Sequence, residues 1–212
     1  ILTHFNKSNQ DNSQAFSMNV ARSFDINKPG TKPAKLQGGV IGGSISKGSV
    51  KIGDTIEIAP GRKIKNNWKN IVTKVESLYG GGKREELESG GLVAIGTTLD
   101  PSVTKADSLT GGVVGSLGSL PPVWDDFKMK VTLLDRVVGA KIIQDVDELK
   151  VNEPLMLSVG SSTTVGIPTK IAKDTVSVNL KLSVCAPIGQ RIAISRRVEG
   201  RWHLIGYGIL EE

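Results

Sequence analysis

The sequence predicts an all-β protein made of two consecutive closed β-barrels, and three observations lead to this prediction. Valine, isoleucine and threonine are abundant, and 25 glycines and 9 prolines suit many short strands joined by turns. Segments in both halves alternate apolar and polar residues, as half-buried strands do. Between them, residues 115–122 (GSLGSLPP) lose this alternation and have the composition of a linker. We therefore expect a leader or the remnant of a preceding domain over 1–15, one barrel over 16–118 and another over 119–212.

Length and composition limit the classes of function. The 212 residues, 38% of them apolar, can bury a sizeable core. A net charge of +6 favours an anionic partner, although a solvated basic surface explains it equally well. The single cysteine, Cys185, excludes an internal disulfide and is expected to pack in a strand. Because no apolar run reaches ~18 residues, we expect no membrane partner and a cytoplasmic location.

Residues 38–58 (GGVIGGSISKGSVKIGDTIEI) are the most informative stretch of the first barrel. The expected elements are a strand ending at 42–43, a short strand at 44–45, a turn at 47–48, a strand at 50–52, a turn at 53–54 and a strand at 55–58. The glycines allow backbones to pass closely at barrel corners. The expected inward-facing residues are Val40, Ile45, Val50, Ile52, Ile56 and Ile58.

The rest of the first half continues in the same style. A strand is expected near 17–26, with Met18, Val20 and Arg22 on one face. The following segments are a loop at 27–33 with two prolines, a turn at 59–61, a basic loop or irregular hairpin at 62–69, a strand at 70–78, a glycine-rich loop at 79–91, a strand at 92–96, a loop at 97–106 and a strand at 109–114. Trp68, in the basic segment, is expected to cover the core, and base stacking is its alternative role.

The second half predicts a barrel of about six strands. The expected strands are 127–134, 154–159, 166–173, 175–184, 192–197 and 201–210, with a loop or helical turn at 134–145. In the fourth of these strands, Val176, Val178, Leu180 and Leu182 are expected on one face. In the last, Trp202 and Leu204 are expected on the face opposite Ile205.

Residues for catalysis are almost absent. The two histidines, His4 and His203, are too few for a metal cluster or a histidine-centred triad. Residues 43–48 have the glycine spacing of a phosphate-binding loop, but Ser49 and Val50 follow where lysine and serine or threonine are required. We therefore expect no catalytic, nucleotide-binding or metal-binding residues in this chain, and no enzyme activity.

Six motifs occur along the chain in one order: VARSFDINKPGT, GGVIGGSISKGSVKIGDTIEIAPG, GGLVAIGTTLDP, TGGVVGSLGSLPP, LLDRVVG and AISRRVEGRWHLIGYG. Together they resemble the gamma subunit of archaeal and eukaryotic translation initiation factor 2, over roughly residues 17–212. That family has a GTP-binding domain followed by two barrels, and this chain resembles only the barrels, which are of the translational GTPase second- and third-domain type. The resemblance implies GTP and Mg²⁺ for the full-length protein alone, and it makes the start at Ile1 look like a truncation.

The resemblance also implies a site for the acceptor end of methionyl initiator tRNA. By similarity, this site falls on Arg22, Ser23 and Phe24 in one strand and on Val40, Ile41, Gly42 and Gly43 beside it. A terminal adenosine needs an apolar slot with close backbone approach, and an arginine suits its phosphate or ribose. The alternative for Phe24 and Val40 is that both are core residues.

Partner subunits are implied in the same way. The family's alpha subunit docks on loops that correspond here to residues 28–37 and 79–88. The residues expected to contribute are Lys28, Pro29, Gly30, Thr31, Lys32, Pro33, Tyr79, Lys83 and Arg84. The beta subunit and the small ribosomal subunit are further implied partners, and Arg196, Arg197, Arg201 and Trp202 would face the GTP-binding domain or assembly partners.

Two alternatives remain open from the sequence. The first is the barrel region of another translational GTPase, such as the selenocysteine-specific elongation factor. The second is a general RNA-binding barrel protein, which the basic charge alone suggests.

Overall fold

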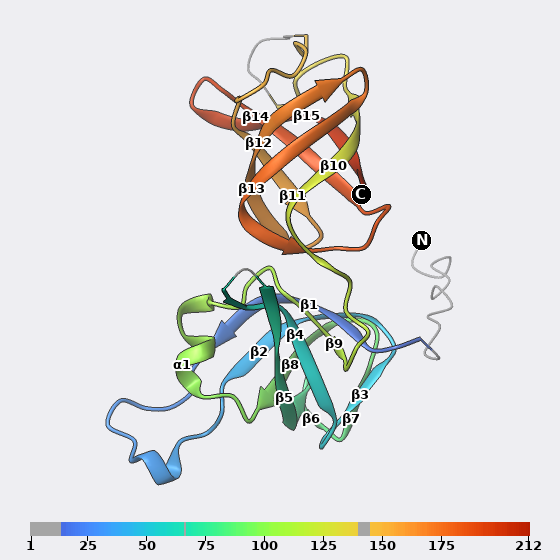
Figure 1. Cartoon of the computed structure of the whole chain (residues 1–212). Helices are drawn as coiled ribbons and strands as arrows, with labels where there is room; N and C mark the ends of the chain where they lie inside the picture. Colours follow the sequence, from blue (N-terminus) through green and yellow to red (C-terminus); the bar gives the residue numbers. More distant parts are fainter. Residues whose placement is uncertain (1–13, 66, 140–144) are drawn as a thin grey trace, which may run out of the picture. The chain divides into compact units, whose positions relative to one another are not determined.

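The computed structural model describes residues 14–65, 67–139 and 145–212, and most of them lie in β-strands (Figure 1). The leader expected over 1–15 therefore lies almost wholly outside the described residues. The chain divides into two compact units, Ile1–Leu120 and Pro121–Glu212, and this division falls inside the segment expected to be a linker. Among the described residues, no helix has the length and apolar character needed to cross a membrane.

The first unit is a closed barrel with a small additional sheet. Its strands are β1 (Ser17–Phe24), β2 (Val40–Lys47), β3 (Ser49–Lys51), β4 (Thr55–Ile64), β5 (Asn67–Tyr79), β6 (Lys83–Arg84), β7 (Glu86–Glu88), β8 (Leu92–Thr97) and β9 (Val113–Ser116). The strand order is β4-β9-β1-β2-β8-β5, and the pairing of β4 with β5 closes the barrel. β6 pairs with the end of β5, while β3 and β7 pair separately. The largest fully buried side chains in this core are Met18, Ile41, Ile56, Ile58 and Ile95.

The second unit is a closed barrel of six strands. They are β10 (Val123–Leu133), β11 (Leu155–Val159), β12 (Ser162–Ala172), β13 (Thr175–Cys185), β14 (Arg191–Val198) and β15 (Arg201–Glu211), in the order β10-β13-β12-β11-β14-β15. It has its own core, and Cys185 is buried as expected. The all-β prediction and the two barrels are confirmed.

Several details of the first barrel differ from the prediction. No strand ends at Gly42 and Gly43, because both lie within the continuous strand β2. Gly43 is required there for packing, since a Cβ on it would lie 1.9 Å from the carbonyl oxygen of Asn19 on β1. Ile52, expected inside, is 47% exposed because β3 has already ended at Lys51 and a turn follows.

The predicted turn at 59–61 is also wrong, because β4 continues through these residues to Ile64. The register between β4 and β5 shifts between Ile58 and Arg62, so the chain passes an irregularity without turning. A Cβ on Gly61 would lie 2.0 Å from the carbonyl oxygen of Lys69 on β5, which explains the glycine. Residues 62–64 and 67–69 therefore form the far end of a long β-hairpin.

Arg22 was expected on the same face as Met18 and Val20, and a register shift in β1 places it on the other face. Met18 and Val20 are fully buried, but the pairing of β1 with β2 shifts between Val20 and Arg22. Beyond this irregularity Ser23 is buried, whereas the Arg22 side chain is 70% exposed. A bulge thus places the arginine on the outer face of the barrel.

The second barrel has one comparable correction. Leu182 is exposed, because the ladder between β13 and β10 is interrupted between Asn179 and Val184, where β13 bends. Ile205 is buried while Trp202 and Leu204 are exposed, so these residues lie on opposite faces as predicted. In the predicted loop at 134–145, residues 140–144 lie outside the described residues.

Candidate functional site

The structure brings all seven residues expected at the tRNA acceptor end together on two neighbouring strands. β1 and β2 run antiparallel and are hydrogen-bonded to each other. The paired residues are Arg22 with Gly42, Ser23 with Ile41, Phe24 with Val40, and Val20 with Gly43.

Only some of these seven residues can contact a ligand. Ile41 is fully buried in the barrel core. Ser23 is 1% exposed, and its hydroxyl oxygen accepts a hydrogen bond from the Leu109 backbone N–H at 3.0 Å. Phe24 is 38% exposed and is not a core residue. Val40 is buried, which agrees with its alternative as a core residue, although it lies outside the main core cluster.

Arg22 is held on the outer surface by Asp107, which follows the short helix α1 (Pro101–Thr104). The Arg22 Nε–H donates to Asp107 Oδ1 at 2.8 Å, and the Ser23 backbone N–H donates to the same oxygen at 3.1 Å. Hydrogen bonding from Arg22, then from Ser23, lowers the pKa of Asp107 from its ordinary value. The hydrogen bond to Asp107 and the charge of Asp107 raise the pKa of Arg22. A guanidinium has five N–H donors, so its engagement through Nε leaves a charged, oriented group facing solvent.

The row that contains Arg22 and Gly42 continues across two more strands. Gly42 pairs with Ala94 on β8, and Ala94 pairs with Tyr79 on β5. Tyr79 is 56% exposed, and Phe24 lies two positions from Arg22 on the same side of β1. We call Arg22, Phe24, Gly42, Ala94 and Tyr79 the small-residue face.

The small-residue face combines small residues in its middle with aromatic and basic groups around them. A Cβ on Gly42 would have its nearest neighbours at 3.8 Å, so packing alone does not require glycine there. Tyr79, expected to dock the alpha subunit, lies instead in the row of the residues expected at the acceptor end. Sequence reasoning missed Ala94, which the alternation of β8 could have placed outside the barrel.

The first predicted docking loop is ordered by its own hydrogen bonds. Asn27 Nδ2 donates to the Gln37 carbonyl and the Gln37 N–H donates to Asn27 Oδ1, both at 2.8 Å, which closes the base of the loop. The Thr31 N–H donates to the Lys28 carbonyl, and a short 3-10 helix covers Pro33–Lys35. These contacts, with two prolines, give the loop a defined shape.

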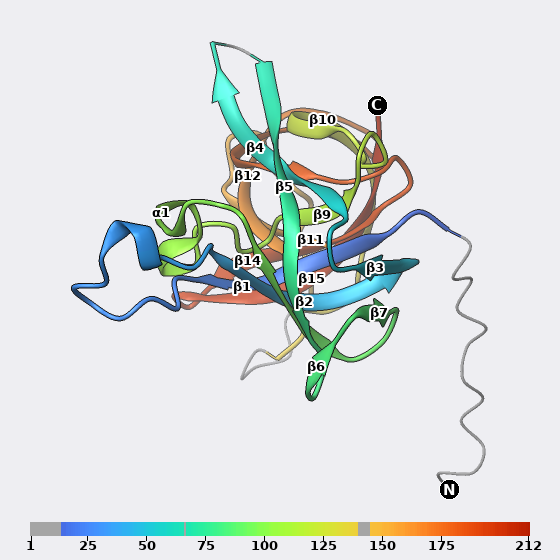
Figure 2. The same cartoon turned by 90° about the horizontal axis from the view of Figure 1, so that it is seen from below.

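The second predicted docking loop contains a tight hairpin. Lys83 and Arg84 form β6, which pairs with the end of β5. The Gly80 N–H donates to the Gly82 carbonyl, and Gly81 between them adopts φ +71°, which explains the glycine run. Figures 1 and 2 show the two docking loops leaving the first unit at different places, so the structure does not bring them together.

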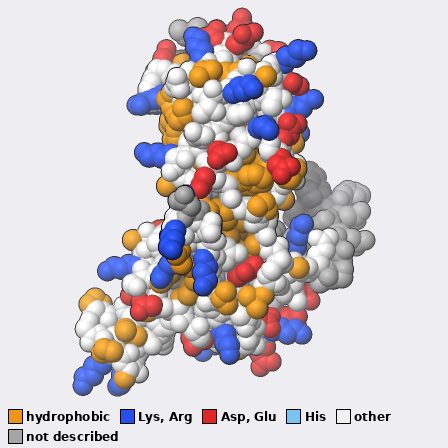
Figure 3. Space-filling model, viewed as in Figure 1, with side chains coloured by type: hydrophobic (Ala, Val, Ile, Leu, Met, Phe, Trp, Pro, Cys, Tyr) orange, Lys and Arg blue, Asp and Glu red, His pale blue; other side chains and the backbone are white. Residues whose placement is uncertain are grey.

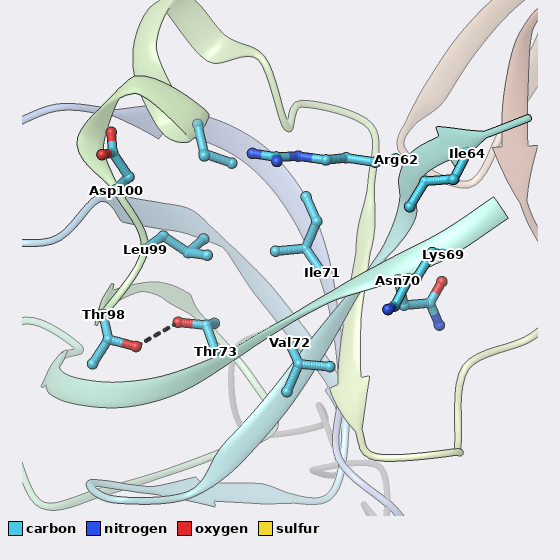
Figure 4. Close-up of a pocket in the computed structure, with 11 residues that line it drawn as sticks. Arg62, Ile64, Lys69, Asn70, Ile71, Val72, Thr73, Thr98, Leu99 and Asp100 are labelled. Carbon is cyan, nitrogen blue, oxygen red and sulfur yellow. Dashed lines mark hydrogen bonds between the residues drawn. The ribbon is translucent and has the colours of Figure 1, made fainter.

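A pocket of about 420 Å³ lies at the base of the β4–β5 hairpin, where the sequence predicted no site (Figure 4). Its apolar lining includes Ile71, Leu99 and Val103, and Figure 4 shows the Arg62 side chain extending across it above Ile71. The hydroxyls of Thr73 and Thr98, 3.0 Å apart, share a hydrogen bond at one side. The remaining lining residues are Ile64, Lys69, Asn70, Val72 and Asp100.

The four residues expected to face partners in the second barrel have different roles. Arg196 is bound internally, donating to Glu153 and to the carbonyl oxygens of Asp147 and Glu148. Arg197, Arg201 and Trp202 are not buried. Within the described residues, no group of three or more histidine, cysteine or acidic side chains is arranged to hold a metal ion.

Comparison with known proteins gives strong sequence relatives. Residues 125–210 match the family model of the C-terminal domain of initiation factor eIF2 gamma. Translation initiation factor 2 subunit gamma of Archaeoglobus fulgidus is 53% identical over 195 residues, which cover 91% of this chain and 46% of that protein. The same subunit of Methanothermobacter thermautotrophicus is 52% identical over 92% of this chain and 49% of its own length. The chain spans about half the length of the curated relatives it matches.

Solved structures with the same fold are more distant in sequence. Translation elongation factor SelB from Methanococcus maripaludis, in complex with the GTP analogue GPPNHP, superimposes with a TM-score of 0.70 at 20% identity, covering 100% of this chain and 46% of SelB. A bacterial selenocysteine-specific elongation factor gives a TM-score of 0.68 at 18% identity, covering 99% of this chain and 29% of that one. These similarities concern the fold alone. On the sequence relationship, the chain belongs to the family of translation initiation factor 2 gamma subunits, and it corresponds to the C-terminal barrel region of that family.

Proposed function

We propose that this chain is the barrel part of a translation initiation factor subunit that helps to deliver methionyl initiator tRNA to the small ribosomal subunit and that docks an alpha subunit. In the full-length protein, GTP and Mg²⁺ would belong to a separate GTP-binding domain, and a beta subunit would complete a cytoplasmic heterotrimer. The observation that carries the proposal is the sequence identity of about half with initiation factor 2 gamma subunits over nine-tenths of this chain.

The small-residue face has the chemistry that the acceptor end of a tRNA needs. An unpaired terminal nucleotide presents a flat base, a ribose and a phosphate. Gly42 and Ala94 leave room for close approach to the backbone, and Phe24 and Tyr79 offer aromatic surface beside them. Arg22, oriented by Asp107, supplies positive charge for a phosphate.

The experiment is a titration of fluorescent methionyl initiator tRNA with the 212-residue chain and its Gly42→Leu variant, read by anisotropy. We expect weak binding that decreases as salt rises, because phosphate contacts release counterions. Gly42→Leu should weaken it about tenfold by blocking the face. Thr163→Leu, an equivalent change at an exposed strand position of the second barrel, should have no effect. Tight binding that is insensitive to salt, or equal affinity of the Gly42→Leu variant, would contradict the proposal.

Docking of the alpha subunit is tested separately by calorimetry. Lys32→Glu together with Pro33→Gly reverses one charge and loosens the ordered loop, so both contact and pre-organisation are lost. We expect at least tenfold weaker binding of the alpha subunit. Lys181→Glu with Pro187→Gly, both at exposed positions of the second barrel, is the matched control, and it should leave the affinity unchanged. Equal loss in both variants would argue against docking on this loop.

A further inference from the structure

The β4–β5 hairpin carries a concentration of positive charge. Residues 59–73 (APGRKIKNNWKNIVT) contain four lysines and arginines and no acidic residue. Figure 2 shows the hairpin extending beyond the barrel, and Lys and Arg side chains gather near its end in Figure 3. Arg62 and Lys69 are direct partners across the two strands. Like charges in directly opposed positions destabilise a ladder, so this pair suits an anionic partner.

An aromatic side chain lies on the other face of the same hairpin, because the pair Lys63–Trp68 follows the pair Arg62–Lys69 in the ladder. Trp68 is only partly buried, is paired with Lys63 in the ladder, and has the Lys63 Nζ 5.5 Å from its ring centroid. It therefore does not cover the core, which was the expected role. Indole rings beside basic groups are the usual means by which proteins stack on unpaired bases.

The pocket at the base of the hairpin adds a place for one base. Its volume of about 420 Å³ is in the range of small-molecule sites, and its apolar wall is formed by Ile71, Leu99 and Val103. Arg62 and Lys69 also line it, so positive charge lies next to the apolar wall. One carboxylate is present, Asp100; hydrogen bonding from Ser102 lowers its pKa, and the positive charge of Arg62 makes a smaller contribution. The pocket thus offers two cations against one anion.

We infer that the basic hairpin and this pocket form a second RNA-binding surface, which binds a single-stranded segment by its phosphates and holds one base in the pocket. Arg62 and Lys69 contact phosphate on the pocket side of the hairpin, and Thr73, Thr98 and Asn70 are the polar groups nearest the base edge. Trp68 stacks on a neighbouring base where the RNA passes over to the other face of the hairpin. The charge pattern alone would also suit an acidic peptide. The partly exposed indole and the apolar pocket favour RNA, because a nucleotide joins a flat apolar base to a phosphate.

This surface is separate from the small-residue face. Tyr79 and Trp68 lie near opposite ends of the thirteen-residue strand β5, and Arg62 belongs to β4, which does not contribute to the face. The segment from α1 to Asp107 lies between the two, since Val103 lines the pocket while Asp107 binds Arg22. Substitution at one surface should therefore leave the other intact.

The first test measures the anisotropy of a labelled oligouridylate of about twelve nucleotides, a typical site length for single-strand binding, at several salt concentrations. Arg62→Ala with Lys69→Ala removes two phosphate contacts, so the slope of log affinity against log salt should decrease by about 1.4. Lys170→Ala with Lys181→Ala, at exposed positions of the second barrel, changes the net charge equally and should leave the slope unchanged. An unchanged slope in the hairpin variant would overturn the proposal.

Lys69→Glu separates binding from folding. This change converts the repulsive pair with Arg62 into an attractive one, so the melting temperature should rise while RNA affinity falls more than tenfold. Loss of affinity in a variant at least as stable as the parent cannot be ascribed to unfolding. A variant that binds RNA as well as the parent does would count against the hairpin.

Val103→Phe tests the pocket without changing charge. Filling the pocket should lower the affinity about tenfold, as the loss of one stacked base does, with the salt slope unchanged. Gly42→Leu should leave oligouridylate binding unchanged, which keeps this result distinct from failure of the acceptor-end proposal. If polyglutamate of similar length displaces the RNA at equal concentration, the surface is a site for acidic protein and the proposal fails.

Discussion

At the scale of single residues, the neighbouring glycines Gly42 and Gly43 have different structural roles. A Cβ on Gly43 would clash with the carbonyl oxygen of Asn19, whereas a Cβ on Gly42 would project onto the small-residue face without a close contact. Gly43→Ala should therefore lower the free energy of unfolding by about 1–3 kcal/mol through overpacking, while Gly42→Ala should change it by less than about 0.5 kcal/mol. Chemical denaturation of the two variants measures this difference. Equal destabilisation would show that Gly42 is also required for packing.

The ion pair between Asp107 and Arg22 should make the stability of the fold depend on pH. Because Arg22 and Ser23 lower its pKa below the ordinary value of 3.8, its ionised form stabilises the fold above that pH, and this contribution is lost as the pH falls through the lowered pKa. Asp107→Asn removes the charge but tolerates the positive φ of +58° at this position. The melting temperature of the parent should exceed that of the variant at neutral pH, and the difference should shrink below about pH 3.8. A difference that is constant across this range would exclude the ionic contribution.

The alternation of residues along β1 correctly predicted that Met18 and Val20 lie on one face, but it placed Arg22 on that face too, which is wrong. Alternation assumes that strands pair without interruption, and a bulge reverses the face of every residue beyond it. The sequence contains no sign of the bulge, because it depends on the pairing with Gly42 and Gly43. The same reason explains Leu182, where the ladder to β10 is interrupted.

At the scale of elements, the glycine-rich turns were harder to predict than the strands. Gly61 was expected to turn the chain, yet it lies within β4 where two backbones approach closely. Glycine permits both, and the choice depends on which strand lies opposite. For the same reason the hairpin at 62–69 and its pocket could not be derived from the sequence: the pocket lining comes from β4, β5 and the segment at 98–103, which lie far apart in the chain.

Arg196 acts as a clamp between β14 and the loop at 147–153. Its side chain and that of Glu153 are 14% and 19% exposed, and Arg196 also donates to two carbonyl oxygens of the loop. Arg196→Met should lower the free energy of unfolding by roughly 2 kcal/mol, because it removes the cation from a largely buried carboxylate and the side-chain donor from two carbonyls. Arg197→Met, at the next position, is the control and should cost less than about 0.5 kcal/mol. Hydrogen exchange should accelerate in the loop of the first variant alone.

At the scale of the whole molecule, each barrel has its own core. The residues of the first core all lie before Leu120 and those of the second all lie after Pro121. Residues 121–212 alone should therefore fold, showing β-sheet circular dichroism and a cooperative thermal transition. A fragment without a cooperative transition would show that its barrel requires the first unit.

The first barrel cannot close during synthesis until its last strand, β9, has been made. β1 pairs with β9, and this contact joins Ser17 to Gly115. At a synthesis rate of about 5–20 residues per second, β1 must wait roughly 5–20 seconds for its second neighbour to be made. During that interval one edge of β1 remains unpaired, and an unpaired strand edge can associate with other chains. Binding of a chaperone to the nascent chain should therefore be strongest before residue 116 leaves the ribosome.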